Sequence, residues 1–340
     1  MKKRIKWLDI MKGLAMLMVI YSHVEYHPSV PMSFFAPVFL TVFFFTGGYT
    51  FNCKDNFASF LKGKIKGLFI PWLLLGLINI FLTQLLTFNE KIPLQKQIIE
   101  LLLQNGRGGN RLWFIAAMFE GCLIFYFVIK LLDRKRIHLF VGLLFILLSS
   151  SVIWKRIDGS SLPWHLDCMG SVCFWMGVGK LFNIYGKKIE EKLRSGWMLI
   201  LEISVYILLL WINSYFLKTN YVAFSDYGNS ILIYLLLSID GLFWMISLSM
   251  CIEKNDIVTK MISFVGLHSM LYFALHGKAM PLVNKIISVA DHYIHLGLEA
   301  DYPLLMTCVV VILVVISLYL PIYLIGRYIP FLEGKTKNIR

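Results

Sequence analysis

Charged residues are scarce in this sequence of 340 residues. Asp, Glu, Lys and Arg together make up 16% of it, whereas a soluble domain carries about 25%. The hydrophobic share is 58% and the mean hydropathy is +0.70. No stretch between the apolar runs has room for a soluble domain of ~100 residues. These values exclude a soluble globular enzyme and indicate a chain built from membrane-spanning helices.

The common motifs of soluble enzymes are also absent. The sequence contains no Walker loop, no GxGxxG, no HExxH and no GxSxG, which argues against an ATP-driven pump and against a hydrolase of the common serine type. Its six cysteines lie in or beside apolar segments and lack metal-ligand spacing. We therefore expect small buried thiols, with neither a disulfide framework nor a metal site.

The apolar runs predict ten transmembrane helices, since a bilayer core requires about 20 apolar residues per helix. The expected fold is an all-α polytopic membrane protein of a single domain over 1–340, with a core over 7–328 and a cytoplasmic tail over 329–340. The first segment lacks the cleavage site of a signal peptide and is expected to be retained. The expected spans are 7–25, 34–52, 67–87, 112–131, 138–154, 167–185, 197–217, 229–251, 262–287 and 303–328.

The net charge of +13 comes from short basic clusters between apolar runs. This distribution is typical of topology determinants and does not favour nucleic-acid binding. With an even number of spans, most Lys and Arg residues fall on the side of the two termini. The positive-inside rule then places both termini in the cytoplasm. A basic inner face would also suit anionic ligands such as nucleotides.

The first span is richest in ionisable residues, with Asp9, Lys12, His23 and Glu25, although such groups cost about 2.5–3.5 kcal/mol each inside a membrane. Lys12 and His23 share one helix face, because their separation corresponds to three turns plus roughly 20°, with about 16 Å of rise. Asp9 precedes Lys12 by one turn and can pair with it. An imidazole, with a free pKa of ~6.5, suits proton transfer to or from a hydroxyl acceptor. A topology lysine and an interfacial histidine are the alternative interpretation.

Other polar residues within or beside spans are candidates for the site. Lys62, Lys64 and Lys66 on the inner side are either a topology signal or ligands for the phosphates of a nucleotide cofactor. Each of Glu120, Glu202 and Asp240 is either a hydrogen-bonded structural carboxylate, part of a proton path or a catalytic partner. The candidates for substrate binding are Arg111 and Trp113 at the outer mouth of the fourth span and Glu120, His276 and Lys278 within spans.

Two outer loops also carry polar residues. The loop near 88–111 contains the flexible stretch NGRGGNR, which suits substrate entry or contact. The loop near 288–302 is either solvated or a binding site for a metal or a sugar. Its polar residues are Asp291, His292, His295, Glu299 and Asp301.

The first span resembles the opening of the acyltransferase-3 family of bacterial membrane O-acyltransferases. That family has a basic residue followed by ten residues and a His, here Lys12 and His23, although Arg is commoner at the first position. Asp9 to Gly13 is similar to the Asp-x-x-Lys-Gly form of its fucose-4-O-acetylase-like branch. Further segments resemble the family in the same order along the chain: FFFTGGYTF, KGKIKGLFIPWL, RLWFIAAMF, LPWHLDCMG and SFVGLHSMLYFALHG.

The resemblance implies an enzyme of the bacterial plasma membrane that takes acetyl-CoA from the cytoplasm, without a metal. It would move the acetyl group to a hydroxyl of a surface polysaccharide or lipid-linked glycan. His23 would be the general base or a proton relay, and Asp9 and Lys12 would support the donor or orient the catalytic site. Trp113 and His276 would line the cavity. The residues expected to face the CoA phosphates are Lys12, Lys62, Lys64 and Lys66. A carrier or flippase for a lipid-linked sugar, using the same buried charges as its path, is the alternative class, although no internal symmetry is visible.

Overall fold

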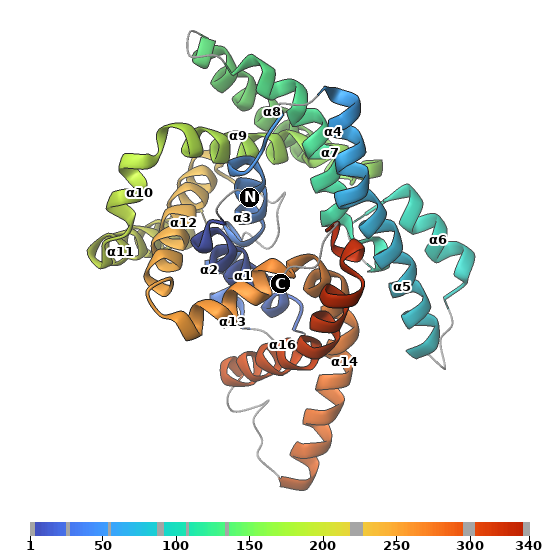
Figure 1. Ribbon diagram of the computed structural model, residues 1–340. Coiled ribbons are helices and arrows are strands. Elements are labelled where there is room, and N and C mark those ends of the chain that lie inside the picture. Colours follow the sequence, from blue (N-terminus) through green and yellow to red (C-terminus); the bar gives the residue numbers. More distant parts are fainter. Residues whose placement is uncertain are drawn as a thin grey trace.

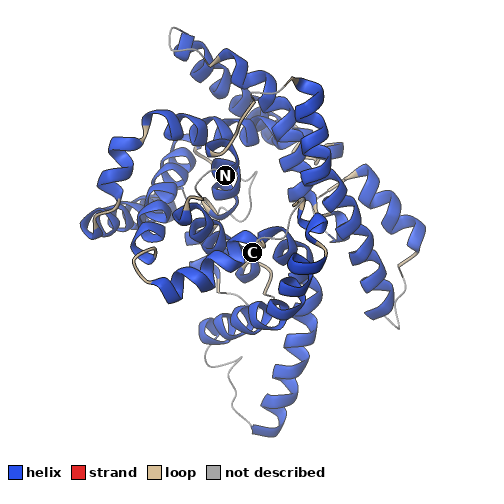
Figure 2. Cartoon of the chain, viewed as in Figure 1, coloured by secondary structure: helices blue, strands red, loops and turns tan. Residues whose placement is uncertain are grey.

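The computed structural model describes residues 4–24, 28–53, 56–86, 92–106, 109–132, 136–217, 227–294 and 303–335. Within these residues every regular element is a helix and no strand occurs (Figure 2), which confirms the all-α class. The α-helices are α1 (Lys6–Tyr21), α2 (Ser29–Phe35), α3 (Phe39–Tyr49), α4 (Phe57–Lys64), α5 (Ile70–Leu86), α6 (Leu94–Leu103), α7 (Trp113–Val128), α8 (Ile137–Ile157), α9 (Met169–Tyr185), α10 (Lys187–Leu193), α11 (Gly196–Ile212), α12 (Ile231–Ile252), α13 (Asp256–Leu267), α14 (Ser269–Ile294) and α16 (Pro303–Tyr328).

Shorter helical turns connect several of these elements. A π-helical segment, η1, joins α4 to α5 and lets them pass as one long apolar unit. The connecting segments are η1 (Ile65–Phe69), η2 (Gly109–Arg111), η3 (Ile129–Leu131), η5 (Pro163–Cys168), η6 (Asn213–Leu217) and η7 (Pro330–Glu333). Segment η6 is π-helical like η1, and the others are 3-10 helices.

Seven helical segments of the described chain are long and apolar enough to cross a membrane, or eight if one bent pair forms a single span. Helices α1 and α9 lie where the first and sixth spans are expected, but have only 16 and 17 residues. At ~1.5 Å per residue, each is shorter than a hydrocarbon core of about 30 Å. The count of ten and the placement of the termini therefore stay predictions.

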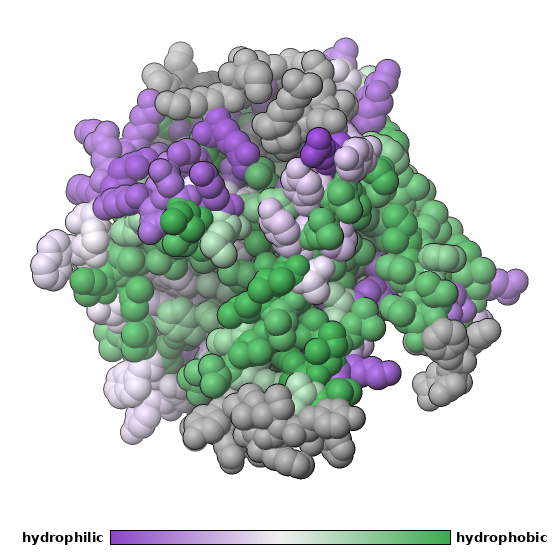
Figure 3. Space-filling model, turned by 60° about the horizontal axis from the view of Figure 1, so that its bottom comes forward, coloured by the Kyte–Doolittle hydropathy of each residue, from purple (hydrophilic) through white to green (hydrophobic). Residues whose placement is uncertain are grey.

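The outer surface of the bundle is strongly apolar. Large side chains such as Trp197 (81% exposed), Phe81 (67%) and Ile146 (67%) point away from the core. Figure 3 shows hydrophobic residues across much of one face, with hydrophilic residues gathered toward one edge. Contiguous apolar surface of this kind requires a nonpolar surrounding, so the protein is a multi-pass membrane protein.

Helix α1 lies near the centre of the bundle (Figure 1). It contacts α3, α12, α13, α14 and α16, and most of its side chains are buried. Its central position brings Asp9 into the interior of the protein.

Two glycines allow α1 and α13 to cross at very short range. A methyl group on Gly266 would overlap the backbone carbonyl of Asp9, and one on Gly13 would overlap the carbonyl of Ile262. Small residues permit such close packing between membrane helices, where no hydrophobic effect drives helices together. The crossing therefore fixes the backbone that carries Asp9 and Lys12.

We expect Gly266→Ala to destabilise the protein by about 1–3 kcal/mol, the usual cost of overpacking. The measurement is thermal unfolding in detergent, with a lower Tm as the expected result. Gly142→Ala on α8 is the matched control, because a methyl group there meets nothing within 4 Å. Equal Tm values for the two variants would contradict the close crossing.

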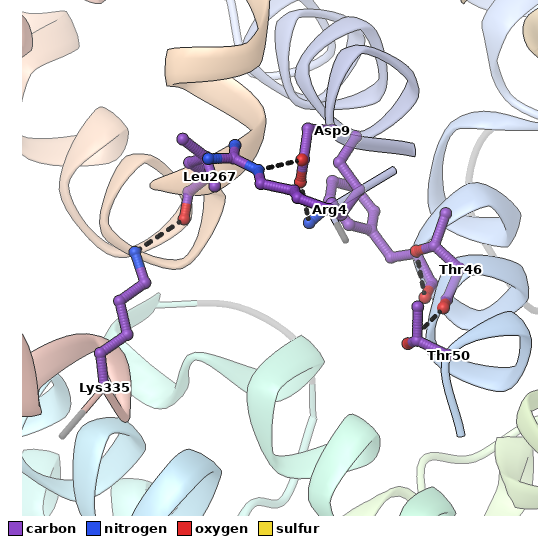
Figure 4. A network of polar contacts seen from close by, with 8 residues as sticks. Arg4, Asp9, Thr46, Thr50, Leu267 and Lys335 are labelled. Atoms are coloured by element: carbon purple, nitrogen blue, oxygen red, sulfur yellow. Dashed lines mark hydrogen bonds and ion pairs between the residues drawn. The ribbon is translucent and has the colours of Figure 1, made fainter. Parts of the chain in front are cut away.

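The ninth expected span, 262–287, is interrupted by a sharp bend and is not one continuous helix. Helices α13 and α14 meet at His268 with a bend of 82°. Glu333 of η7 accepts a hydrogen bond from His268 Nδ1 at 2.5 Å and pairs with Lys335 Nζ at 2.6 Å. Lys335 also donates to the carbonyl of Leu267 at 3.2 Å (Figure 4), one of the carbonyls that the end of α13 leaves without a helical partner. The C-terminal segment thus stabilises the bend.

We expect the stabilisation by Glu333 to depend on pH. Burial raises the pKa of Glu333, but hydrogen bonds from His268 and Lys335 outweigh it and hold the pKa below its ordinary value of 4.5. A lowered folded-state pKa adds stability above the unfolded pKa, and this is lost as the pH falls through the folded value. Glu333→Gln should therefore lower Tm near neutral pH, and its difference from the unmodified protein should shrink as the pH falls below 4.5 through the folded-state pKa of Glu333. A difference that does not change with pH would contradict this expectation.

Candidate functional site

A cavity of about 1090 Å³ lies beside α1, slightly larger than the usual small-molecule site of about 300–1,000 Å³. It is enclosed by segments of α1, α3, α4, η1, α7, α9 and α14. Its lining includes charged residues (Arg4, Asp9, Lys12, Lys64, Lys180), polar residues (Thr46, Thr50, Asn52, Ser59, Asn183) and apolar residues (Met16, Leu40, Phe43, Phe114, Ile115, Met118, Met270, Phe273).

Charged and apolar residues occupy opposite ends of this cavity. On α1 the lining residues run from Arg4 through Lys12 to Met16, from charged to apolar. On helix α7 the lining residues follow the same direction. Cys122 lies beside the charged Lys64, and Phe114 lies at the apolar end. The cavity therefore has a cationic end near residues 4–12 and an apolar end near Met16 and Phe114.

Asp9 organises the cationic end. Its carboxylate accepts from Arg4 Nε at 2.6 Å and pairs with Lys12 Nζ at 3.0 Å, and Figure 4 shows Arg4 reaching toward Asp9. The pairing of Asp9 with Lys12, predicted from their spacing, is thus present. Asp9 is only 6% exposed, so one buried carboxylate positions two cations, whose remaining N–H donors can bind an anion. Arg4 was not among the predicted site residues, although it belongs to the basic N-terminal cluster.

The three lysines of the KGKIKG segment do not act as one group. Lys64 lines the cavity, where its Nζ lies 5.3 Å from the centre of the Phe60 ring. Lys62 and Lys66 are exposed and are not among the lining residues. Lys62 and Lys66 are four residues apart and share one helix face, whereas Lys64, two residues from each, points to the opposite side. Of these lysines, only Lys64 is placed to contact a ligand in the cavity.

Lys180 completes the cationic end and was missed in the sequence. It extends from α9 and donates to the carbonyl of Phe51 at 2.9 Å. Among the described residues that line the cavity, four are cations and Asp9 is the one carboxylate. The cavity end thus carries an excess of positive charge, which suits a polyanionic ligand.

His23 follows directly after α1 and lies beyond the apolar end of the cavity. It shares the α1 face of Lys12 and Met16, two turns or about 10 Å past Met16, and its side chain is exposed. Its Nδ1 lies 2.8 Å from the carbonyl of Val19. A carbonyl only accepts hydrogen bonds, so neutral His23 carries its proton on Nδ1 and leaves the Nε2 lone pair available for a proton.

His276 is the predicted substrate-binding residue that the fold brings to His23. The centres of the two rings are 4.8 Å apart, and His276 is 5% exposed. Its Nδ1 bonds to the carbonyl of Tyr272 at 3.0 Å, so this ring also presents its Nε2. The two histidines come from sequence positions far apart and form a pair at the C-terminal end of α1.

The other predicted substrate-binding residues lie in separate surroundings. Arg111 pairs with Glu100 at 3.2 Å, and the Trp113 ring packs against His165 at 5.6 Å. Lys278 donates to Thr83 Oγ1 at 2.5 Å. None of these three lines the cavity described above.

Three carboxylates of the spans also lie apart from the cavity lining. Glu120 Oε2 is buried and has no hydrogen-bond partner among the described residues, as is also true of Asp240 Oδ2. Glu202 accepts from Ser247 at 2.6 Å between α11 and α12.

The first part of the loop predicted near 288–302 is helical, because α14 continues to Ile294. Residues 295–302 and the side chains of Asp291 and His292 lie outside the described part of the chain, as do residues 107–108 of the NGRGGNR stretch. Within the residues that are described, no group of three or more His, Cys, Asp and Glu residues could hold a metal ion.

The structure thus combines a bundle of apolar helices, a cavity with four cations at one end and a histidine pair beyond the other end. A family model described as an acyltransferase domain matches residues 5–325. The chain therefore belongs to the acyltransferase-3 family and is a membrane acyltransferase. No curated protein and no solved structure matches the chain.

Proposed function

We propose that this protein is an O-acetyltransferase of the bacterial plasma membrane. It transfers an acetyl group from cytoplasmic acetyl-CoA to a hydroxyl of a surface polysaccharide or lipid-linked sugar. The observation that carries the proposal is the cavity beside α1, which has four cations at one end and His23 on the same helix face beyond the other.

The cationic end of the cavity fits the phosphates of CoA. Arg4, Lys12, Lys64 and Lys180 surround it, and phosphate groups bind well to such charged donors. Lysines bind phosphate as point charges without the paired geometry of Arg, so several together compensate for weaker individual contacts. The apolar end then suits the uncharged arm that carries the thioester.

The exposed position of His23 fits contact with the acceptor. In the proposed reaction, His23 Nε2 takes the proton of the acceptor hydroxyl while the hydroxyl oxygen attacks the thioester carbonyl carbon. A C–O bond forms and the C–S bond breaks, so the products are an acetyl ester and the CoA thiolate, which then takes up a proton. A positioned general base typically accelerates such a step by about 10²–10⁴-fold.

A carrier for lipid-linked sugars would leave the glycan chemically unchanged, and family membership favours the acyltransferase. The test is mass spectrometry of surface glycans from cells with and without the gene. We expect acetyl esters to disappear from one glycan and to return with the intact gene. Unchanged acetylation, or loss of a lipid-linked intermediate in its place, would overturn the proposal.

A further inference from the structure

Three phenylalanines from three helices line the apolar end of the cavity. They are Phe43 of α3, Phe114 of α7 and Phe273 of α14. Their rings contact one another in sequence, with centres 5.3 Å apart for Phe43 and Phe114 and 5.5 Å apart for Phe114 and Phe273. We call these three residues the aromatic barrier.

The histidine pair lies directly beyond the aromatic barrier. The Phe273 ring is 6.0 Å from that of His276, which is 4.8 Å from that of His23. Phe273 and His276 are one turn apart on α14 and therefore share a face. A group that moves from the cationic cavity to His23 along this face must pass Phe273.

The members of the barrier differ in how firmly they are held. Phe43 and Phe114 are each 8% exposed and belong to the packed core. Phe114 also packs against Phe44 at 5.0 Å and Trp113 at 5.9 Å. Phe273 is only partly buried, so its ring is the member of the barrier that has most room to turn.

We propose that Phe273, backed by Phe114 and Phe43, limits the length of the acyl group that reaches His23. An acetyl group passes beside the Phe273 ring, whereas longer chains meet the three rings and are held back in the cavity. The inference rests on the proposed function and adds the specificity of the donor to it. Each methylene that an apolar site accepts or rejects changes discrimination by about 10–200-fold, so removal of one ring has a measurable effect.

The test compares acetyl-, butyryl- and octanoyl-CoA as donors for membranes that contain the unmodified protein or Phe273→Ala. We expect the ratio of kcat/KM for butyryl-CoA to that for acetyl-CoA to rise at least about tenfold in the variant. Phe243→Ala is the matched control, since Phe243 on α12 is likewise partly buried but is not a lining residue. Its ratio should equal that of the unmodified protein.

The outcomes separate the two proposals. If the unmodified protein transfers acetyl and Phe273→Ala leaves the donor ratio unchanged, the barrier is overturned and the acetyltransferase stands. If the unmodified protein transfers no acetyl group, the proposed function fails first. Phe273→Leu removes less volume and keeps the test valid if the alanine variant does not fold. We expect its donor ratio to lie above that of the unmodified protein and below that of Phe273→Ala. An unchanged ratio overturns the barrier.

Discussion

Membranes that contain His23→Ala should transfer acetyl groups at a rate lower by about 10²–10⁴-fold, the usual contribution of a general base. The Nδ1 of His23 is held by the Val19 carbonyl, so its Nε2 is the atom placed to take the proton of the acceptor. Alanine leaves no group at this position with a suitable lone pair. The measurement is the initial rate of acetyl transfer from acetyl-CoA to membrane glycans.

The control for His23→Ala is His138→Ala. His138 is exposed on α8 and lines no part of the cavity, so its replacement should leave the rate unchanged. His23 is exposed as well, and its removal should therefore shift Tm only slightly. Full activity of His23→Ala would refute the role of His23, and a large loss of Tm would show that the lost activity has a structural cause.

Lys64→Ala should raise the KM for acetyl-CoA roughly ten- to hundredfold, because a hydrogen bond to a charged group contributes about 1.5–3 kcal/mol. The phosphates lie far from the reacting carbonyl, so kcat should change much less. Lys66→Ala is a closely matched control: it removes the same charge two residues away, but Lys66 is exposed and does not line the cavity.

Equal KM values for Lys64→Ala and Lys66→Ala would contradict the proposed donor site. If KM rises by the same factor in both variants, the general positive charge of this segment attracts CoA without a specific contact to Lys64. Raising the salt concentration separates these cases further, because screening weakens long-range attraction between exposed charges more than a direct contact inside a cavity.

The helical membrane fold could be predicted from the sequence because a bilayer imposes a strong physical constraint on composition and length. Ion pairs between residues one helical turn apart could also be predicted from the sequence. Asp9 and Lys12 lie one turn apart, and the structure shows their ion pair. The bend at His268 was not predicted, because it depends on Glu333 and Lys335, which reach it from the far end of the chain.

The composition of the site was predictable only in part. The face shared by Lys12 and His23 follows from helical periodicity, whereas the contact of His23 with His276 depends on how α1 and α14 pack. Periodicity could also have separated Lys64 from Lys62 and Lys66. Lys180 gave no local signal, because only the packing of α9 against α3 brings it to the cavity.

Isotope-labelled acetyl-CoA supplied to inside-out membrane vesicles, which expose the cytoplasmic face, tests the central claim most directly. With the unmodified protein, we expect mass spectrometry to find the labelled acetyl group as an ester on a glycan, and with His23→Ala we expect at least about a hundredfold less of it. Vesicles of the opposite orientation should give no labelled ester, because the donor then cannot reach the cationic end of the cavity. A labelled ester that forms equally with His23→Ala, or no ester with the unmodified protein, would contradict the account.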